Sequence, residues 1–311
     1  MSLLHERFQD YLQMRRALGF RLVLAEVHLR RFCEFMDARG ATTVSSALAL
    51  EWATSLPHIQ PTSWAGRLSC VRQFGRYLQA FDPATEVPEV RLLPFRPKRS
   101  QPYHYTRREI RALMATASEL RSRQTLRPWT LRTLIGLLSV TGMRLNEALT
   151  LTDNDVDLAT GVLTVRGSKF SKSRLVPLHE STRCALQDYL TRRNACLGAR
   201  PRAPYFLLTG WGHQFWSGQV YKAFRQISCR IGLRHSLRGR GPRLHDLRHR
   251  FATETLLRWS RSNMDIEREM PTLTTYLGHS NISDTYWYLS AHPRLLRHAA
   301  LRLQRRWGGS R

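Results

Sequence analysis

A proline-rich, basic stretch in the first third of the chain is the feature that most limits how the chain can fold. Five prolines fall between residues 83 and 102, and each one removes a backbone donor that a helix interior or a central strand would use. With 311 residues, enough chain lies on either side of the stretch to build two separate hydrophobic cores. We therefore predict a helical domain over residues 1–82, a linker over 83–104 and a second domain over 105–311.

The chain carries a large excess of positive charge along its whole length. Lysine and arginine number 49 against 23 aspartates and glutamates, which gives a formal net charge of +26. A surface of this kind binds polyanions through the release of their counterions, so nucleic acid is the expected partner and a membrane is not. No segment approaches the roughly 18 consecutive apolar residues of a membrane span. The five cysteines include no C-x-x-C pair, so we predict a cytoplasmic protein without disulfides or structural zinc.

Two stripes of apolar residues at helical spacing predict a helical bundle in the first domain. The stripes consist of Ala25, Leu29, Phe32 and Met36 in one helix and Trp64, Leu68, Val71, Phe74 and Leu78 in another. Arginines on the opposite face of a single helix usually form only a solvated surface. The net charge of the whole chain favours contacts with the DNA backbone instead. The candidate side chains, in the second of these helices and in the linker, are Arg67, Arg72, Arg76, Arg96, Lys98 and Arg99.

The pattern changes at Tyr105, where a second, mainly helical domain begins. Thr106 and Glu109 have the spacing of a capping box at the start of a helix, and Gly142 can end the next helix. Short β-rich runs over 153–167 and 173–179 predict a small hairpin. Further helices are expected over 181–197, 217–231, 245–259 and 293–307. The last is amphipathic, with inward positions Leu296, Ala299, Ala300, Leu303 and Trp307. The fold class is therefore mainly α with one small β-hairpin in the second domain.

Four short stretches of the second domain concentrate basic residues. They are TGMRLNEAL (141–149), VRGSKFSKSRLVPL (165–178), RLHDLRHRFAT (243–253) and LGHS (277–280). In the first, Glu147 lies one helical turn after Arg144 and can orient its guanidinium. In the third, His245 and Arg248 share one face of a helix because they are three residues apart. No paired carboxylates or Cys/His cluster accompany them, so nothing indicates a catalytic metal.

In this order, the four stretches resemble the motifs of the tyrosine recombinases, also called phage integrases. The resemblance covers residues 105–290 and implies six catalytic residues: Arg144, Lys169, His245, Arg248, His279 and Tyr288. Lys169 lies five residues before Arg174, and Lys172 is its rival for the same role; Lys172 and Arg174 are also candidate DNA contacts. The stretch over 254–275 is longer than is usual for the family, and its loop geometry stays open.

The resemblance also implies what such a protein does. Relatives cleave and rejoin DNA through a 3′-phosphotyrosine without cofactor or metal, as homotetramers on paired sites, with or without companion recombinases. Arginines aimed at the phosphate oxygens make such metal-free catalysis physically reasonable. The first domain would be the core-binding domain, and helix 293–307 would dock on a neighbouring subunit or pack within its own. Integration or transposition of a mobile element at the prokaryotic nucleoid is the expected role. An inactive DNA-binding regulator and a topoisomerase of type IB remain alternatives.

Two tyrosines near the C-terminus compete for the nucleophile's position. If residues 283–291 are helical, Tyr286 and Tyr288 point about 200° apart, so both cannot face one phosphate. Ile282, Tyr286 and Leu289 have the spacing of a core-facing stripe, and Tyr288 lies off it. The spacing therefore predicts that Tyr286 packs into the core and that Tyr288 is free to attack, in agreement with the family resemblance.

Overall fold

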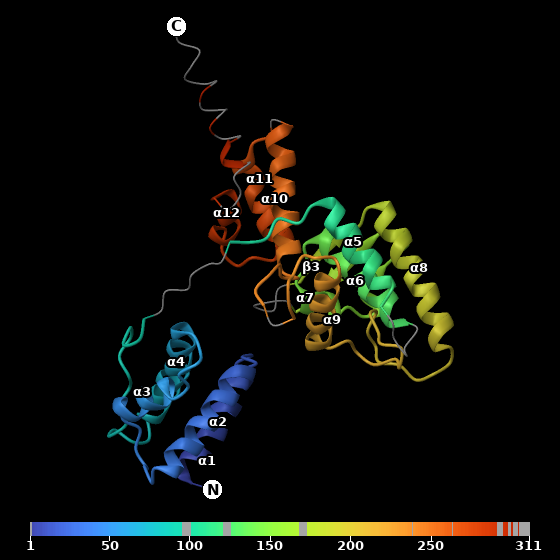
Figure 1. Ribbon diagram of the computed structural model, residues 1–311. Coiled ribbons are helices and arrows are strands. Elements are labelled where there is room, and N and C mark those ends of the chain that lie inside the picture. Colours follow the sequence, from blue (N-terminus) through green and yellow to red (C-terminus); the bar gives the residue numbers. More distant parts are fainter. Residues whose placement is uncertain are drawn as a thin grey trace. The chain divides into compact units, whose positions relative to one another are not determined.

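The chain forms helices and one small antiparallel sheet, the fold class that the sequence predicted (Figure 1). The computed structural model describes residues 2–94, 101–120, 126–167, 173–237, 239–262, 264–290, 295–297, 300 and 304. The chain divides into two compact units, Met1–Ser100 and Gln101–Arg311. Several predicted site residues lie outside the described residues: Arg96, Lys98, Arg99, Lys169 and Lys172.

The first unit is a bundle of helices around an aromatic core. Its helices are α1 (Leu3–Ala17), α2 (Val23–Ala38), α3 (Ser46–Thr54) and α4 (Pro61–Leu78). The predicted stripes supply much of the core, because Leu29, Phe32, Met36, Leu68, Val71, Phe74 and Leu78 are all buried. The Phe74 ring lies 6.2 Å from that of Phe8 and 5.4 Å from that of Tyr11, which ties α4 to α1. The periodicity argument is confirmed for these helices.

The start of the predicted linker packs as part of the first unit. The Arg72 guanidinium donates to the carbonyl oxygens of Pro88 and Glu89, at 2.7 Å each. The Glu86 backbone N–H donates to the Val44 carbonyl at 2.8 Å, and the Glu86 carboxylate accepts from the Ser46 backbone N–H at 2.7 Å. Prolines prevent the regular backbone hydrogen bonds of a helix interior or a β-sheet, but they do not prevent the hydrogen bonds made by Arg72 and Glu86. The first compact unit therefore extends beyond the boundary predicted at residue 82.

Two of the three α4 arginines predicted to contact DNA are engaged within the first unit. Arg67 is only 5% exposed, lies over the Trp52 ring at 4.1 Å and donates to the Trp52 carbonyl at 2.7 Å. Arg72 is half-buried and holds the segment that follows α4. Arg76 is exposed. The prediction for Arg67 was therefore wrong, because its aliphatic stem and guanidinium both pack against an aromatic ring.

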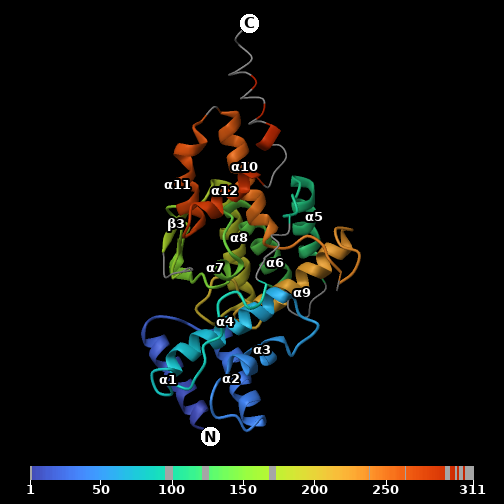
Figure 2. The same cartoon turned by 90° about the vertical axis from the view of Figure 1, so that its left-hand side faces the viewer.

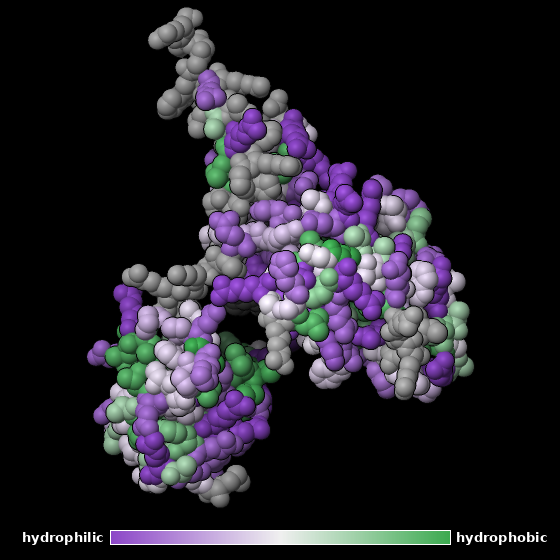
Figure 3. Space-filling view, viewed as in Figure 1, coloured by the Kyte–Doolittle hydropathy of each residue, from purple (hydrophilic) through white to green (hydrophobic). Residues whose placement is uncertain are grey.

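The second unit is built around a mostly buried helix, α6 (Leu126–Thr141). Packed with it are α5 (Arg107–Ser118), α7 (Leu145–Leu149), α8 (Glu180–Leu197) and α9 (Ser217–Arg230). The capping box at α5 is confirmed: the Glu109 N–H donates to Thr106 Oγ1 at 3.1 Å, and the Thr106 N–H donates to Glu109 Oε2 at 2.6 Å. Hydrophilic residues predominate on the visible face of this unit (Figure 3).

The predicted hairpin is present, with one extra short strand. The strands are β1 (Val156–Asp157), β2 (Val162–Val165) and β3 (Arg174–Pro177), antiparallel in the order β1-β2-β3. Leu163 pairs with Val176, and both side chains are buried in the core of the unit. Arg174 therefore begins β3, opposite Val165.

Three helices gather at one side of the second unit, as Figures 1 and 2 both show. They are α10 (Asp246–Arg261), α11 (Ile266–Leu277) and α12 (Ser283–Ser290), and they share a small apolar cluster. The long 254–275 stretch is thus mostly helical, since it completes α10 and forms most of α11. Asp265 caps α11 by accepting from the Glu267 and Arg268 N–H groups, at 3.0 and 3.3 Å. None of the helices in the described ranges is long and apolar enough for a membrane crossing.

Little of the predicted C-terminal helix falls within the described residues. Leu295 is buried against the cluster formed by α10, α11 and α12. Leu296, which was expected to face inward, is 54% exposed, and Ala300 is exposed as well. The prediction for Leu296 and Ala300 was therefore wrong, while Ala299, Leu303 and Trp307 lie outside the described residues.

Candidate active site

The site begins at the sharp turn between α6 and α7. Gly142 ends α6 with φ +62°, a left-handed conformation that glycine adopts without strain. A Cβ at this position would lie 2.6 Å from Phe251 Cδ1, so only glycine fits the space. The turn places Arg144 at the N-cap of α7 and leaves the Gly142 carbonyl free to accept from the Arg248 guanidinium at 2.8 Å.

Glu147 binds two arginines at once. Its Oε1 accepts from Arg144 at 2.7 Å and from Arg174 at 3.1 Å, and its Oε2 accepts from Arg174 at 2.7 Å and from the Arg144 backbone N–H at 2.9 Å. Burial raises the pKa of this carboxyl, but the hydrogen bonds and charge of the two arginines outweigh burial and hold the pKa at about 2. The predicted Arg144–Glu147 pair is confirmed. Arg174 was expected to contact DNA, yet its side chain is only 8% exposed and points inward to Glu147.

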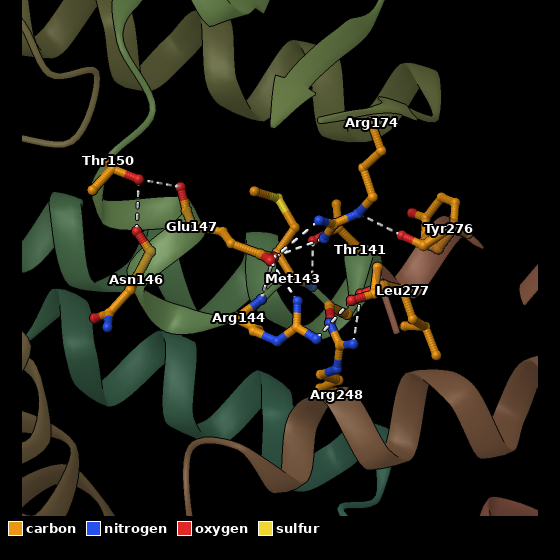
Figure 4. Close-up of polar contacts among 12 residues, drawn as sticks. Thr141, Met143, Arg144, Asn146, Glu147, Thr150, Arg174, Arg248, Tyr276 and Leu277 are labelled. Atoms are coloured by element: carbon orange, nitrogen blue, oxygen red, sulfur yellow. Dashed lines mark hydrogen bonds and ion pairs between the residues drawn. The ribbon is translucent and has the colours of Figure 1, made fainter. Parts of the chain in front are cut away.

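Three arginines converge on the C-terminal end of α11 (Figure 4). The Arg174 Nε donates to the Tyr276 carbonyl at 2.6 Å, an Arg248 nitrogen to the Leu277 carbonyl at 2.6 Å, and an Arg144 nitrogen to the Gly278 carbonyl at 2.8 Å. The last carbonyls of a helix lack partners of their own and carry the negative end of its dipole. The helix end therefore fixes the three guanidinium groups relative to one another.

Histidines surround the arginines. His245 is the N-cap of α10 and keeps an exposed edge, while the enclosure of its ring and the positive charge of Arg248 lower its pKa. Burial, with Arg248 and Arg144, lowers the pKa of His279 to about 4. Burial, with His245, lowers the pKa of His249 to about 3. All three rings are therefore neutral near pH 7.

Tyr288 is the tyrosine that faces this site. It is 3% exposed, its ring stacks on that of His279 with centroids 6.0 Å apart, and its centroid lies 5.4 Å from that of His249. Burial raises the pKa of its phenol above the usual value, although the charge and hydrogen bond of Arg248 and the charge of Arg144 offset part of that rise. A basic site of this kind stabilises the phenolate that an attacking tyrosine must become.

The predicted orientation of α12 was wrong. Tyr286 is 40% exposed and Ile282 is 43% exposed, so two of the three residues that were expected to enter the core face outward, and only Leu289 packs against the apolar cluster. The reason is that α12 turns Tyr288 inward, where its ring meets His249 and His279 as well as the apolar cluster that the three helices share. The choice of Tyr288 as the candidate nucleophile therefore depends on its place in the site and not on a free, exposed ring.

The structure brings together Arg144, His245, Arg248, His279 and Tyr288, five of the six residues that the family resemblance had implied. Two further residues line the site and were not predicted: His249, whose ring lies 4.8 Å from that of His245, and Thr285, which hydrogen-bonds His279. His249 could have been found from the sequence because it directly follows Arg248. No sequence pattern points to Thr285. Within the described part of the chain, no group of three or more potential metal ligands is present.

Comparison with known proteins agrees with the site. A model described as the phage integrase family matches residues 104–294. The chain is 47% identical to the integrase/recombinase y4rB of Sinorhizobium fredii over 310 residues, which cover 99% of each chain. It is 30% identical to the tyrosine recombinase XerD of Caulobacter vibrioides over 233 residues, which cover 74% of this chain and 71% of XerD.

Solved structures share the fold. The Tn1549 transposon integrase, in complex with a circular intermediate DNA, is 18% identical with a TM-score of 0.66 and covers 97% of this chain and 100% of its own. The crystal structure of XerA recombinase is 21% identical with a TM-score of 0.51 and covers 97% of this chain and 98% of its own. With the family match over most of the second unit and a 47% identical relative of equal length, the chain belongs to the phage integrase family of tyrosine-type site-specific recombinases.

Proposed function

We propose that this recombinase cleaves a strand of double-stranded DNA by attack of the Tyr288 hydroxyl on a phosphodiester. The new bond joins the phenol oxygen to the 3′-phosphate, and the 5′-oxygen leaves with a proton. The observation that carries the proposal is the contact of the buried phenol with Arg248, beside Arg144, at a site whose geometry is held by main-chain carbonyls.

Each side chain has a role that follows from its chemistry. Arg144 and Arg248 offer rigid forks of donors to the non-bridging oxygens, where negative charge builds up as the phenol attacks. His245 is neutral near pH 7 and exposed at one edge, so it suits the removal of the phenol's proton. Lys169 is proposed as the acid that protonates the leaving 5′-oxygen, with Lys172 as its rival.

The reverse reaction with a 5′-hydroxyl from another strand exchanges strands without an energy source. We propose a homotetramer on paired sites as the assembly for this exchange, with the first unit binding the DNA backbone through exposed arginines such as Arg76. Integration or transposition of a mobile element is the proposed role. Its support is that two similar proteins are an integrase/recombinase and a transposon integrase.

The test is a covalent adduct formed without metal. Genomic fragments that flank the gene are first selected for binding, and a labelled, nicked duplex from the bound site is then incubated with protein in EDTA. Wild type and Tyr286→Phe should give a protein–DNA adduct on denaturing gels, whereas Tyr288→Phe should give none. Tyr286 is the matched control because it lies two residues away on the exposed face of the same helix.

Three outcomes contradict the proposal. Specific binding without any adduct from the wild type indicates a regulator without chemistry. Relaxation of supercoiled plasmids that lack the selected site, with no strand exchange between two labelled sites, indicates a topoisomerase. An adduct that survives Tyr288→Phe and disappears in Tyr286→Phe moves the nucleophile to Tyr286.

A further inference from the structure

Thr285 connects α12 to the histidine that stacks on Tyr288. Its side chain is completely buried, and its hydroxyl lies between two partners. Thr274 Oγ1, on α11, donates to Thr285 Oγ1 at 2.9 Å, and Thr285 Oγ1 lies 2.8 Å from His279 Nδ1. Three polar groups from α11, α12 and the turn between them therefore form one short chain that ends on the ring of His279.

The direction of this chain decides where His279 carries its proton. A hydroxyl has one hydrogen, so a threonine that accepts from one neighbour donates to the other. Because Thr274 donates to Thr285, the Thr285 hydrogen points to His279 Nδ1, which then acts as an acceptor. A neutral imidazole with an acceptor Nδ1 carries its hydrogen on Nε2.

One competing arrangement reverses the direction of these hydrogen bonds. Thr274 Oγ1 also lies 2.7 Å from the Met270 carbonyl, and donation of its only hydrogen to that oxygen would make Thr285 donate to Thr274. His279 would then carry its hydrogen on Nδ1 and present a lone pair at Nε2. In that arrangement Thr285 accepts from the Nδ1–H of His279 instead. We favour donation from Thr274 to Thr285, because the Met270 carbonyl already receives a backbone N–H within α11 and does not depend on the Thr274 hydroxyl.

We propose that Thr285, oriented by Thr274, is a positioning residue that fixes His279 as the neutral tautomer with its hydrogen on Nε2. His279 then offers a hydrogen bond to a phosphate oxygen without adding a third positive charge beside Arg144 and Arg248. Phosphate oxygens only accept, so the opposite tautomer would contribute nothing to them. The role at the phosphate rests on the proposed function, but the position of the hydrogen does not.

Nuclear magnetic resonance on the free protein tests the tautomer directly. With ¹⁵N-labelled histidine, long-range ¹H–¹⁵N correlations separate a ring nitrogen that carries hydrogen from one with a lone pair. His279→Gln identifies the signals by removing them. The expected result at pH 7 is a protonated Nε2 and an unprotonated Nδ1. A protonated Nδ1 overturns the proposal, whether or not the protein cleaves DNA.

Variants test the positioning role in the adduct assay. Thr285→Val keeps the branched shape but loses the hydroxyl, and we expect cleavage about tenfold slower together with mixed His279 tautomers. Thr285→Ser keeps the hydroxyl and should stay within about threefold of wild type. An amide at the end of glutamine reaches the place of Nε2, while that of asparagine reaches the place of Nδ1, so His279→Gln should cleave faster than His279→Asn.

Each result has a distinct meaning. Unchanged tautomers in a folded Thr285→Val protein, or faster cleavage by His279→Asn than by His279→Gln, contradict the positioning role. If Thr285→Val does not fold, the tautomer is still determined from the wild-type spectrum, and its role in cleavage from the comparison of His279→Gln with His279→Asn. Absence of any adduct from the wild type refutes the proposed function, while the spectrum of the free protein separately decides the tautomer.

Discussion

Replacement of Glu147 by glutamine should weaken the second unit more than the loss of a single surface charge would. The carboxylate holds Arg144 and Arg174 together, and its pKa falls from 4.5 to about 2 in the folded protein. At about 1.4 kcal/mol per unit of pKa, this difference corresponds to about 3 kcal/mol of stability at neutral pH. Removal of one partner from a buried ion pair costs about as much, since it leaves the other charge uncompensated.

The same pKa fixes how the effect changes with pH. A carboxyl with a lowered folded pKa stabilises the protein fully above its unfolded pKa of 4.5, and this contribution disappears as the pH falls towards 2. The difference in unfolding free energy between wild type and Glu147→Gln should therefore be about 3 kcal/mol at pH 7 and markedly smaller at pH 3.

Urea unfolding followed by tryptophan fluorescence at several pH values measures this difference. Glu119→Gln is the matched control, because Glu119 is an exposed carboxylate in the same unit and its replacement should change the free energy by less than about 0.5 kcal/mol. A loss below about 1 kcal/mol at pH 7, or a loss that is the same at pH 7 and pH 3, would refute the reasoning that Glu147 is a strongly coupled buried anion.

Further predictions concern Gly142 and three arginines. Gly142→Ala meets both a left-handed backbone and the Phe251 ring, so its melting temperature should fall well below that of Gly19→Ala, where φ is +85° but the space is open. Arg76→Met should lower the slope of log K against log salt for DNA binding by about 1, while Arg67→Met should leave the slope unchanged and lower thermal stability. Arg174→Lys loses the bidentate contact with Glu147, so adduct formation should slow about tenfold or more while DNA affinity is retained. Equal rates of adduct formation by the wild type and Arg174→Lys would contradict a role for this contact in the site.

Local patterns predicted most of the helices, because the residues that form a stripe or a cap are neighbours in sequence. Leu68, Val71 and Phe74 entered the core as their spacing indicated, and Thr106 with Glu109 formed the expected capping box. The catalytic candidates were suggested by motif order, and five of them meet in one site. Lys169 stays a prediction.

The failures share a cause, which is that the partner of a side chain lies far away in sequence. Arg67 and Arg174 were taken as exposed because they are charged, yet Trp52 and Glu147 bury them. Tyr286 was assigned to the core because periodicity assumes that a buried helix face is apolar. Tyr288 is buried instead, where it meets His249, His279 and Arg248, and no pattern within 283–290 contains that information.

The site arginines are positioned by the backbone at the end of α11 and not by its side chains. The groups that receive Arg174, Arg248 and Arg144 are carbonyl oxygens of the main chain, so substitution of the side chains at Tyr276 and Leu277 leaves their acceptors in place. Gly278 has less freedom, because a Cβ there would lie 2.8 Å from an Arg174 nitrogen. The length of α11 has no such freedom. Insertion or deletion of one residue would rotate the last carbonyls by about 100° and move them by about 1.5 Å along the axis, which would detach all three arginines together. During divergence, the composition of this helix can therefore drift while its number of residues stays fixed.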